Sequence, residues 1–578
     1  MRILLLAHAF NSVTQRLWTE LRADGHELSL ELDIADAVSL EAVEAFDPDL
    51  VLAPFLKRAI PEPIWSRRLT LVVHPGPPGD RGPSALDHAL LEGLRDWGVT
   101  VLQAAAGFDE GPVWAWQPCT LRAGATKGSS YRHEVVDAAV AAVRAALARV
   151  VPGRATPLAA TLPSLPLPRG WRPLVTRAER AVDWGRHAAD EARRRIASAD
   201  GAPGAAGTLF GQPCKLFDAH AASAAAVERC LVAAPGQVIA RRGPALLVRC
   251  AEGALWIGHV RRGDDGLKLA AVQAFPGEAA ALPEWPVPLM RADDEWDELR
   301  YTESGPPEAR VGRLDVDVLN GALSERASTR LLAALREVAA RPAQVLLLAG
   351  GADFFCNGID LHAIEAAAAH AGDSAADASM RAIEAIDDVA LALLQMTDRV
   401  TVAALRGNAG AGGCFLALAA DRVWAHAGVV QNPHYKNMGN LYGSEYWTYL
   451  LPRRVGPAEA RAITQGRLPM GAAEAQARGL VDEVLGADAT AFEALLPARA
   501  AALAQQADGL VVAKRRQRAA DEALRPLAAY RADELARLRR NFYGFDPSYH
   551  VARHHFVHRK PHAWTPRHLA LHRRPSPR

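Results

Sequence analysis

Two side chains capable of proton transfer, His74 and Asp109, each follow a predicted strand near the start of the chain. In LTLVVHPGPPGDRG an apolar strand ends at His74, because the Pro and Gly residues behind it cannot continue a strand or a helix. In GVTVLQAAAGFDEGPV a second strand precedes Asp109 in a Gly-flanked turn. If the two strands are parallel neighbours, their carboxyl ends bring the side chains together. Such a pair can transfer protons at a carbonyl carbon, whereas either residue alone could simply end a strand or shape a loop.

Two Gly-rich turns further along the chain could bind a carbonyl oxygen. AQVLLLAGGADFFCNGIDLHAIE contains a strand, a turn and a helix start, and Gly358 lets the N–H of Ile359 point inward. TVAALRGNAGAGGCFLALAAD repeats this order, with a helix that begins near Gly412. The first N–H groups of a helix have no intrahelical partner and lie at the positive end of its dipole. Two such donors can hold one thioester oxygen.

A polar and aromatic segment, QNPHYKNMGNLYGSEYW, follows the second turn. Each aromatic residue in it could simply pack in the core, but as a group these side chains more readily line an acyl pocket. The members are His434, Tyr435, Lys436, Asn437, Tyr442, Ser444, Glu445 and Tyr446. We expect Tyr442 and Tyr446 to handle protons, with His434 and Glu445 as the next candidates.

Composition favours a multidomain protein that acts on small molecules. At roughly 150 residues per domain, 578 residues predict three or four domains. The 66 Lys and Arg residues balance 65 Asp and Glu residues, so no net field indicates binding to nucleic acid. The six cysteines form no CxxC pair, and no metal site is expected. The apolar run in MRILLLAHAF is too short for a signal peptide or a membrane span, so we expect a cytoplasmic protein without membrane contacts.

The elements that must position these residues form three regions. Residues 1–150 alternate apolar runs at 3–6, 50–52, 69–73 and 99–102 with amphipathic stretches, which is typical of a parallel α/β sheet. A Pro-rich linker is predicted at 151–170, and short runs at 231–232, 237–240, 245–248 and 254–257 indicate a small β domain over 172–285. Residues 275–310 look irregular, and 305–578 form one α/β unit with an Ala-rich helical end.

The segments around His74 and Asp109 resemble the formyltransferases that use formyl-tetrahydrofolate. In that family a strand ending Asn-x-His-Pro leads to an Arg-Gly loop, and a later GVTVH…DxGP carries the catalytic Asp. The resemblance gives His74 and Asp109 the catalytic roles. DPDLVLAPFLKRAIPEPIW is similar to the family's pterin-binding strand and loop, and AVDWGRHAADEARRRIASADGAPGA to its linker helix and C-terminal barrel. The folate contacts so implied come from Pro54, Phe55, Leu56, Ile60 and Arg81.

Two positions depart from the formyltransferase pattern. Val72 stands where the family has its catalytic Asn, and Leu102 stands where GVTVH ends in His. An amide that donates to a developing oxyanion contributes about 3–4 kcal/mol to lowering the barrier. Either another donor substitutes for the Asn or the acceptor chemistry differs.

The two Gly-rich turns are similar to those of the crotonase (enoyl-CoA hydratase/isomerase) superfamily, over roughly residues 312–500. The resemblance implies a coenzyme A site in which Ile359 and Gly412 supply the oxyanion-hole amides, flanked by Gly358 and Gly413. The two catalytic glutamates of hydratases are replaced by Phe415 and His434. Water cannot readily be added across a double bond without those carboxylates, so hydratase activity is not expected.

The order of these parts is similar to that of the hydrogenase maturation factors of the HoxX type, and HPGPPGDRG and NPHYKNMGNLYGSEYW carry the match. The resemblance implies a multidomain α/β protein: a Rossmann-like domain over 1–150, a small OB-like β-barrel over 172–285 and a crotonase fold over 305–578. It also implies formyl transfer from formyl-tetrahydrofolate to coenzyme A, then decarbonylation of formyl-CoA to carbon monoxide for nickel–iron hydrogenase. The hydrogenase large subunit or its maturation machinery would be a partner.

Formyl-CoA explains the missing glutamates, because it has no α-carbon from which a base could form an enolate. Three other functions stay open: a folate-dependent hydrolase that releases formate, an acyl-CoA lyase with a vestigial folate domain, and a non-catalytic assembly scaffold. The basic segment RRNFYGFDPSYHVARHHFVHRKPHAWTPRHLALHRRPSPR is either a solvated tail or a contact for coenzyme A phosphates.

Overall fold

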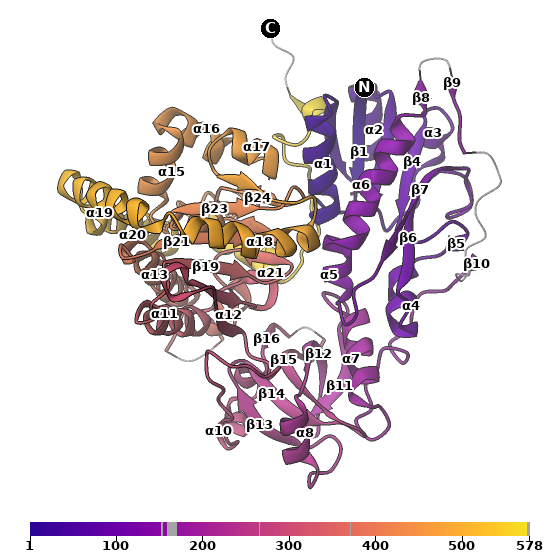
Figure 1. Ribbon diagram of the computed structural model, residues 1–578. Coiled ribbons are helices and arrows are strands. Elements are labelled where there is room, and N and C mark those ends of the chain that lie inside the picture. Colours follow the sequence, from indigo (N-terminus) through magenta and orange to yellow (C-terminus); the bar gives the residue numbers. More distant parts are fainter. Residues whose placement is uncertain (152–153, 159–169, 265, 370–371, 575–578) are drawn as a thin grey trace. The chain divides into compact units, whose positions relative to one another are not determined.

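The computed structural model describes the chain except for residues 152–153, 159–169, 265, 370–371 and 575–578 (Figure 1). The chain forms two compact units. The first contains residues 1–266, 270–284 and 561–578, and the second contains residues 267–269 and 285–560. Most of the predicted linker at 151–170 lies outside the described residues. No helix in the described ranges has the length and apolar character needed to cross a membrane.

The first unit opens with a six-stranded sheet in the order β2-β1-β3-β4-β6-β7. β1 to β4 are parallel, whereas β6 runs antiparallel to β4 and β7 antiparallel to β6. The central runs ILLL and LVLA are buried, as expected for strands covered by helices on both faces. The second and the last of these strands were not predicted from the sequence. The bounds are β1 Arg2–Ala7, β2 Glu27–Leu32, β3 Leu50–Phe55, β4 Thr70–His74, β6 Asp96–Gln103 and β7 Val113–Thr120.

The helices of this sheet are amphipathic, and α6 buries one face through Val136, Val140, Val143 and Leu147. Asn11 caps α1, because its side chain accepts a hydrogen bond from the N–H of Thr14 at 3.1 Å. The bounds are α1 Ser12–Ala23, α2 Asp36–Phe46, α3 Glu62–Trp65, α4 Ala85–Glu92, α5 Lys127–Arg132 and α6 Glu134–Leu147.

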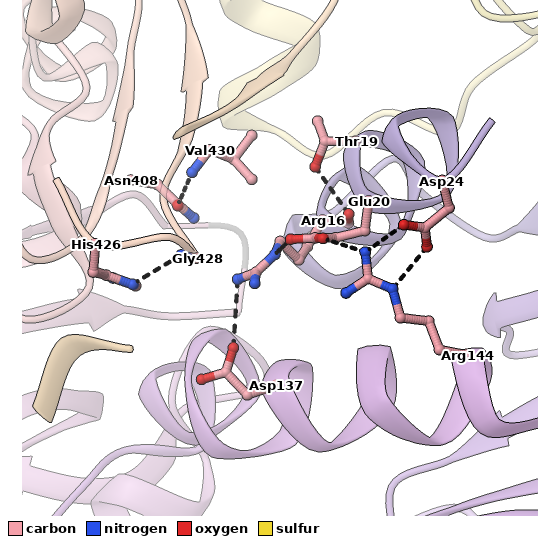
Figure 2. A network of polar contacts seen from close by, with 10 residues as sticks. All are labelled: Arg16, Thr19, Glu20, Asp24, Asp137, Arg144, Asn408, His426, Gly428 and Val430. Carbon is pink, nitrogen blue, oxygen red and sulfur yellow. Dashed lines mark hydrogen bonds and ion pairs between the residues drawn. The ribbon is translucent and has the colours of Figure 1, made fainter. Parts of the chain in front are cut away.

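Ion pairs join α1 to α6 (Figure 2). Arg16 on α1 lies 2.6 Å from Glu20 and 3.4 Å from Asp137 of α6. In return, Arg144 of α6 contacts Asp24 at 2.7 Å and Glu20 at 2.8 Å. Positive and negative side chains alternate where α1 meets α6. Ion pairs therefore hold the two helices together at the polar border of their contact, in addition to the apolar packing.

A small domain follows in the same unit, built on antiparallel strands in the order β11-β12-β15-β14-β13. The predicted runs at 237–240, 245–248 and 254–257 overlap β13, β14 and β15, but Leu231 and Val232 form no strand and are exposed beyond α8. The barrel form of this domain stays a prediction. The bounds are α7 Ala189–Ser198, β11 Ala205–Leu209, β12 Gln212–Ala221, α8 Ala224–Cys230, β13 Val238–Arg242, β14 Ala245–Arg249, β15 Ala254–Arg262, β16 Lys268–Ala270, α9 Ala271–Ala274 and α10 Pro276–Ala280. Two-residue strands are β5 Asp80–Arg81, β8 Val150–Val151, β9 Arg154–Ala155 and β10 Gly170–Trp171.

The end of the chain belongs to the first unit, which corrects the prediction of one domain over 305–578. β2 is an edge strand, and edge strands leave backbone N–H groups without a partner strand. The N–H of Leu30 donates to the carbonyl of Leu569 at 3.0 Å, and that of Leu32 donates to Oγ1 of Thr565 at 2.8 Å. The short 3-10 helix η3 (Leu571–Arg573) follows. The tail therefore covers a sheet edge, so a freely solvated tail is wrong for residues 565–573.

A buried carboxylate holds this tail. Glu31 accepts hydrogen bonds from Nε2 of His572 at 2.7 Å, from Nε of Arg573 at 3.0 Å and from Thr565. Nδ1 of His572 also lies 2.7 Å from the hydroxyl of Ser29. Burial alone would raise the pKa of Glu31, but the hydrogen bonds from His572, Thr565 and Arg573 outweigh it and lower the pKa.

Replacing Glu31 by Gln is expected to lower the free energy of unfolding by about 3 kcal/mol, because it leaves buried donors without a charged partner. Thermal unfolding and proteolysis of the tail measure the effect. The control is Glu41→Gln, since Glu41 is exposed and lies 3.5 Å from Arg573. Because the pKa of Glu31 is lowered in the folded state, its contribution is full above the unfolded value of 4.5 and is lost as the pH falls below it. Equal stability of Glu31→Gln and Glu41→Gln would show that the anchor is unimportant.

The second unit contains a six-stranded sheet in the order β17-β18-β19-β21-β23-β26 and a smaller sheet in the order β20-β22-β24-β25. β17 is antiparallel to β18 and lies in the region predicted to be irregular, while the next four pairings are parallel. The strands are β17 Leu299–Ser304, β18 Val311–Val316, β19 Val345–Gly350, β20 Phe354–Cys356, β21 Val400–Leu405, β22 Asn408–Gly410, β23 Arg422–Ala425, β24 Val430–Asn432, β25 Met470–Gly471 and β26 Glu483–Val484.

The helices of the second unit cover both faces of the larger sheet, and its strands β19 and β21, apolar except for Thr401, are buried throughout. The Ala-rich end is helical, as predicted. The bounds are α11 Glu325–Ala339, α12 Leu361–Ala367, α13 Ala375–Gln395, α14 Gly412–Leu418, α15 Trp447–Val455, α16 Pro457–Gly466, α17 Ala472–Ala477, α18 Ala489–Ala504, α19 Ala507–Leu524, α20 Leu527–Tyr543 and α21 Ser548–Val557, with 3-10 turns η1 Pro307–Ala309 and η2 Leu319–Gly321.

Candidate functional site

His74 lies buried between two carboxylates in the first unit. It is the last residue of β4, and only 4% of its surface is exposed. Its Nδ1 is 3.5 Å from Oδ1 of Asp109, and its Nε2 is 2.9 Å from Oδ2 of Asp80. The pairing of His74 with Asp109 agrees with the sequence prediction. An imidazole with a carboxylate at each nitrogen can pass a proton at a carbonyl carbon.

Asp109 reaches His74 by a different route from the one the sequence suggested. β6 is antiparallel to β4, so the strand ends do not meet; instead, the loop between β6 and β7 returns toward the end of β4. The N–H of Gly82 donates to Oδ2 of Asp109 at 3.1 Å, which fixes the carboxylate. Asp109 has a φ of 56°, and such backbone conformations outside Gly concentrate at functional sites.

Asp80 is a site residue that the sequence analysis missed. It is 2% exposed, and its Oδ1 accepts hydrogen bonds from Arg172 at 3.1 and 3.3 Å. A β-carbon at Gly76 would lie 2.4 Å from Asp80 and 2.5 Å from His74, so a side chain there would separate the two. The Gly/Pro turn thus does more than end the strand. The spacing of six residues between His and Asp in HPGPPGD was the available signal.

The predicted folate contacts begin on β3, the strand next to the one that carries His74. Pro54 and Phe55 end β3, whose neighbour is β4, and the backbone carbonyl of Phe55 accepts from the N–H of His8 at 2.8 Å. Leu56 and Ile60 are half-buried against the apolar core next to β3. Arg81 contacts Glu110 at 2.6 Å. The folate-binding roles of these five residues stay predictions.

The departures from the formyltransferase pattern face each other. Val72 on β4 pairs with Leu102 on β6, so the missing amide and the missing imidazole are replaced by two apolar side chains in register. Polar contacts of His74 beyond Asp109 come instead from Asp80, which Arg172 holds. The end of β4 therefore keeps the His74–Asp109 pair, but the side chains around it differ from those of the formyltransferase pattern.

The two predicted oxyanion turns lie side by side in the second unit. A β-carbon at Gly358 would be 3.4 Å from the backbone nitrogen of Gly412, the first residue of α14. Ala411, before that helix, has a φ of 48°, which aims the next N–H groups into the turn. A β-carbon at Gly413 would lie 1.9 Å from the carbonyl oxygen of Cys356, so only Gly permits this close approach. The two turns are therefore close enough to serve one oxygen atom, and the oxyanion-hole roles of the Ile359 and Gly412 N–H groups stay predictions.

Side-chain hydrogen bonds hold the small sheet that carries the second turn (Figure 2). Oδ1 of Asn408 on β22 accepts from the N–H of Val430 on β24 at 2.8 Å. Nδ1 of His426 accepts from the N–H of Gly428 at 3.0 Å, which shapes the connection before β24. These bonds position β22, and β22 leads directly into the turn at Ala411.

A carboxyl group lies against this turn. Oε1 of Glu445 would be 2.2 Å from a β-carbon placed on Gly412, so it directly adjoins the predicted oxyanion hole. Its Oε2 accepts hydrogen bonds from the hydroxyl of Tyr435 and, at 2.9 Å, from that of Ser444. Burial raises the pKa of Glu445, and burial together with the neighbouring carboxylate raises the pKa of Tyr435. The pair is well suited to accept a proton from a bound acyl group.

Two further buried carboxyl groups position Glu445. Oδ1 of Asp387 accepts from the N–H of Glu445 at 2.8 Å, and Glu534 accepts from the N–H groups of Tyr446 and Thr448 at 3.0 and 2.8 Å. Both Glu445 and Tyr446 have a φ of 58°, a conformation these bonds maintain. Burial raises the pKa of Asp387 well above its usual value and that of Glu534 to about 8.

Of the other predicted pocket residues, one adjoins Tyr435, whereas Tyr442 and Tyr446 make other contacts. His434 is buried beside Tyr435, whose ring stacks on Phe415 with centroids 5.1 Å apart, so Phe415 supports the tyrosine from the position of the missing glutamate. Tyr442 packs against Trp447 at 5.4 Å and against Arg537. Tyr446 lines a cavity of about 560 Å³. No contact between the turn and Tyr442 or Tyr446 is seen in the described residues, and their proton-transfer roles stay predictions.

The fold and the two sites define a fusion of a formyltransferase-like unit with a crotonase-type unit. Residues 31–147 match the family "Formyl transferase", residues 174–274 match "Formyl transferase, C-terminal domain", and residues 314–565 match "Enoyl-CoA hydratase/isomerase". A methionyl-tRNA formyltransferase of Paraburkholderia phymatum is 29% identical over 185 residues, which cover 32% of this chain and 53% of that protein. These matches confirm the predicted Rossmann-like and crotonase folds.

Two relatives match both parts together. Hydrogenase maturation factor HoxX of Bradyrhizobium diazoefficiens is 50% identical, with 99% of this chain and 97% of that protein covered. The crystal structure of HypX from Aquifex aeolicus in complex with tetrahydrofolic acid has a TM-score of 0.91 and 40% identity, with 99% of each chain covered. The chain belongs to the family of hydrogenase maturation factors HoxX and HypX.

Proposed function

We propose that this protein makes carbon monoxide for the maturation of nickel–iron hydrogenase, in two steps at its two sites. The first step transfers a formyl group from formyl-tetrahydrofolate to the thiol of coenzyme A. The second splits formyl-CoA into carbon monoxide and free coenzyme A. The observation that carries the proposal is the position of Glu445 and Tyr435 against the Gly412 turn, in a crotonase fold that lacks both hydratase glutamates.

The first step uses the His74 group. A related HypX has been crystallised with tetrahydrofolic acid, and in this chain the end of β4 carries His74 beside Asp109. We expect His74 and Asp109 to accept the thiol proton as sulfur bonds to the formyl carbon. The C–N bond then breaks, and the folate nitrogen leaves with a proton. Asp80 and Arg172 orient the imidazole from the opposite side.

The second step needs no α-carbon chemistry. The N–H groups of Ile359 and Gly412 hold the formyl oxygen, and the carboxylate of Glu445 removes the proton from the formyl carbon. The C–S bond breaks with its electron pair on sulfur, carbon monoxide leaves, and the thiolate takes up one proton. The hydroxyl of Tyr435 lies on the same carboxylate and can relay that proton to sulfur. Atoms and charge balance without any oxidant or reductant.

Electrostatics support Glu445 as the base. It is buried, and no Arg or Lys in the described part of the chain forms an ion pair with it within 4.0 Å, so its charge is stabilised by neutral groups, the hydroxyls of Tyr435 and Ser444 and the Ser444 backbone. A carboxylate in such surroundings is a stronger base than one in water, as its raised pKa reflects. The stacked Phe415 and Tyr435 rings help exclude water, which would otherwise hydrolyse the thioester.

The deciding experiment mixes the purified full-length protein with isotopically labelled formyl-tetrahydrofolate and coenzyme A, and traps gas on reduced haemoglobin. We expect labelled carbonyl-haemoglobin to form only when both substrates are present. Labelled formate without a requirement for coenzyme A would instead identify a folate hydrolase. Cleavage of ordinary acyl-CoAs that survives His74→Ala would indicate a lyase. If site variants still support hydrogenase maturation in cells, the protein acts as a scaffold.

A further inference from the structure

A cluster of two histidines and a glutamate lies on the second unit and shares no residue with those assigned to the proposed reaction. Glu365 belongs to α12, His554 to α21, and His558 directly follows α21. Oε1 of Glu365 is 3.0 Å from Nδ1 of His554 and 3.1 Å from Nε2 of His558. One nitrogen or oxygen atom from each residue lies within 4.8 Å of the others. Three donor atoms therefore converge on one point.

The helix itself brings the two histidines together. Residues four apart lie on the same helical face, and the rings of His554 and His558 are 4.2 Å apart between centroids. Both side chains are open to solvent, at 46% and 31% exposure, so a solute ion can reach them. The same spacing on a helix supplies two ligands in the HExxH zinc sites. No metal site was expected from the cysteine and histidine spacing, and Glu365 lies 189 residues from His554 in the chain, so spacing could not reveal the cluster.

Glu365 is held in position from behind. Its second oxygen, Oε2, accepts a hydrogen bond from Nε of Arg553 at 2.8 Å, and Arg553 is buried. Arg553 in turn lies over the ring of Tyr549, whose hydroxyl is 2.7 Å from that of Ser379 on α13. Outer contacts of this kind orient a carboxylate ligand before an ion binds. The remaining oxygen, Oε1, therefore faces the two imidazoles.

We propose that Glu365, His554 and His558 bind one late first-row divalent metal ion, with Zn²⁺ as the reference ion, and so join α12 to α21. Two imidazoles and one carboxylate suit Zn²⁺ and Ni²⁺ better than Mg²⁺ or Ca²⁺, which prefer oxygen ligands. Three protein ligands leave at least one position for water, unlike the closed four-ligand structural sites. The site is therefore suited to exchange its metal. It goes beyond the proposed carbon monoxide synthesis and does not depend on it.

The test is competition for Zn²⁺ between a chromophoric chelator and the full-length protein, purified without an affinity tag. We expect His554→Ala, His558→Ala and Glu365→Gln each to weaken the tightest site by about tenfold or more. His555→Ala is the matched control, because His555 lies on the same helix, is exposed and is absent from the cluster. The affinity of His555→Ala for Zn²⁺ should equal that of the unmodified protein.

A second measurement distinguishes this site from scattered binding to the other histidines among the 19 in the chain. Zn²⁺ should raise the Tm of the unmodified protein and of His555→Ala, because the ion binds the folded state, and should raise it less in the double variant His554→Ala/His558→Ala. If the double variant binds Zn²⁺ as tightly as the unmodified protein, or gains the same Tm, the assignment is wrong. Failure of carbon monoxide production would leave this result unaffected.

Discussion

Glu445→Gln is expected to stop decarbonylation and to let formyl-CoA accumulate. The amide keeps the size of the side chain beside Gly412 but cannot accept a proton from the formyl carbon. The loss of a general base typically costs about 10²–10⁴-fold in rate. Formyl-CoA measured by mass spectrometry and carbon monoxide trapped on haemoglobin report the two steps separately. The exposed Glu308→Gln serves as the control and should behave like the unmodified protein.

The tyrosines distinguish between two versions of this mechanism. Tyr435→Phe should slow decarbonylation, because its hydroxyl donates to Glu445, whereas the sequence analysis favoured Tyr442 and Tyr446. Tyr442→Phe and Tyr446→Phe are compared in the same assay. Full carbon monoxide production by Glu445→Gln would exclude the carboxylate as the base. Normal activity of Tyr435→Phe with loss in Tyr442→Phe or Tyr446→Phe would place the relay on those residues.

Asp109→Asn is expected to block the first step and to spare the second. The amide oxygen can still accept the hydrogen bond from Gly82, so the loop keeps its position while the charge beside His74 is lost. We expect formyl transfer to coenzyme A to fall by about 10²–10⁴-fold. Decarbonylation of supplied formyl-CoA should continue at the unmodified rate. The control Asp96→Asn changes an exposed carboxylate at the start of β6.

Equal losses of both steps in Asp109→Asn would contradict the division of labour between the two sites. Combining Asp109→Asn with Glu445→Gln sharpens the test. With formyl-tetrahydrofolate the double variant should accumulate little formyl-CoA, unlike Glu445→Gln alone. With supplied formyl-CoA it should match Glu445→Gln.

Local patterns were enough to predict the elements that carry both sites. The strand before His74 is apolar and ends in a Gly/Pro turn, and the helix at Gly412 follows a strand and a Gly-rich loop. Such signals depend on neighbouring residues only, so they can be read from the chain. The edge strands β2 and β7 escaped prediction, because ELSLEL contains two glutamates and much of VWAWQPCT is exposed, so neither forms an apolar run. The direction of β6 escaped because it depends on the pairing with β4, which no local pattern reveals.

The side-chain partners of the sites depended on contacts that no spacing reveals. Asp80 and Arg172 meet across 92 residues, and Glu445 and Asp387 across 58. The raised pKa of Glu534, about 8, arises from burial that only packing creates. The preference for Tyr435 over Tyr442 likewise follows from which hydroxyl lies on the carboxylate.

The sequence by itself determined the family and predicted two candidate sites, at His74 with Asp109 and at Ile359 with Gly412. It did so because turns, strand ends and helix starts are specified by short runs of residues. Only the tertiary structure decided which groups surround these residues: Asp80 behind His74, Glu445 and Tyr435 at the oxyanion turn, and Glu31 under the C-terminal tail. The physical reason is that hydrogen bonds and desolvation act over a few ångströms in space, whatever the separation along the chain.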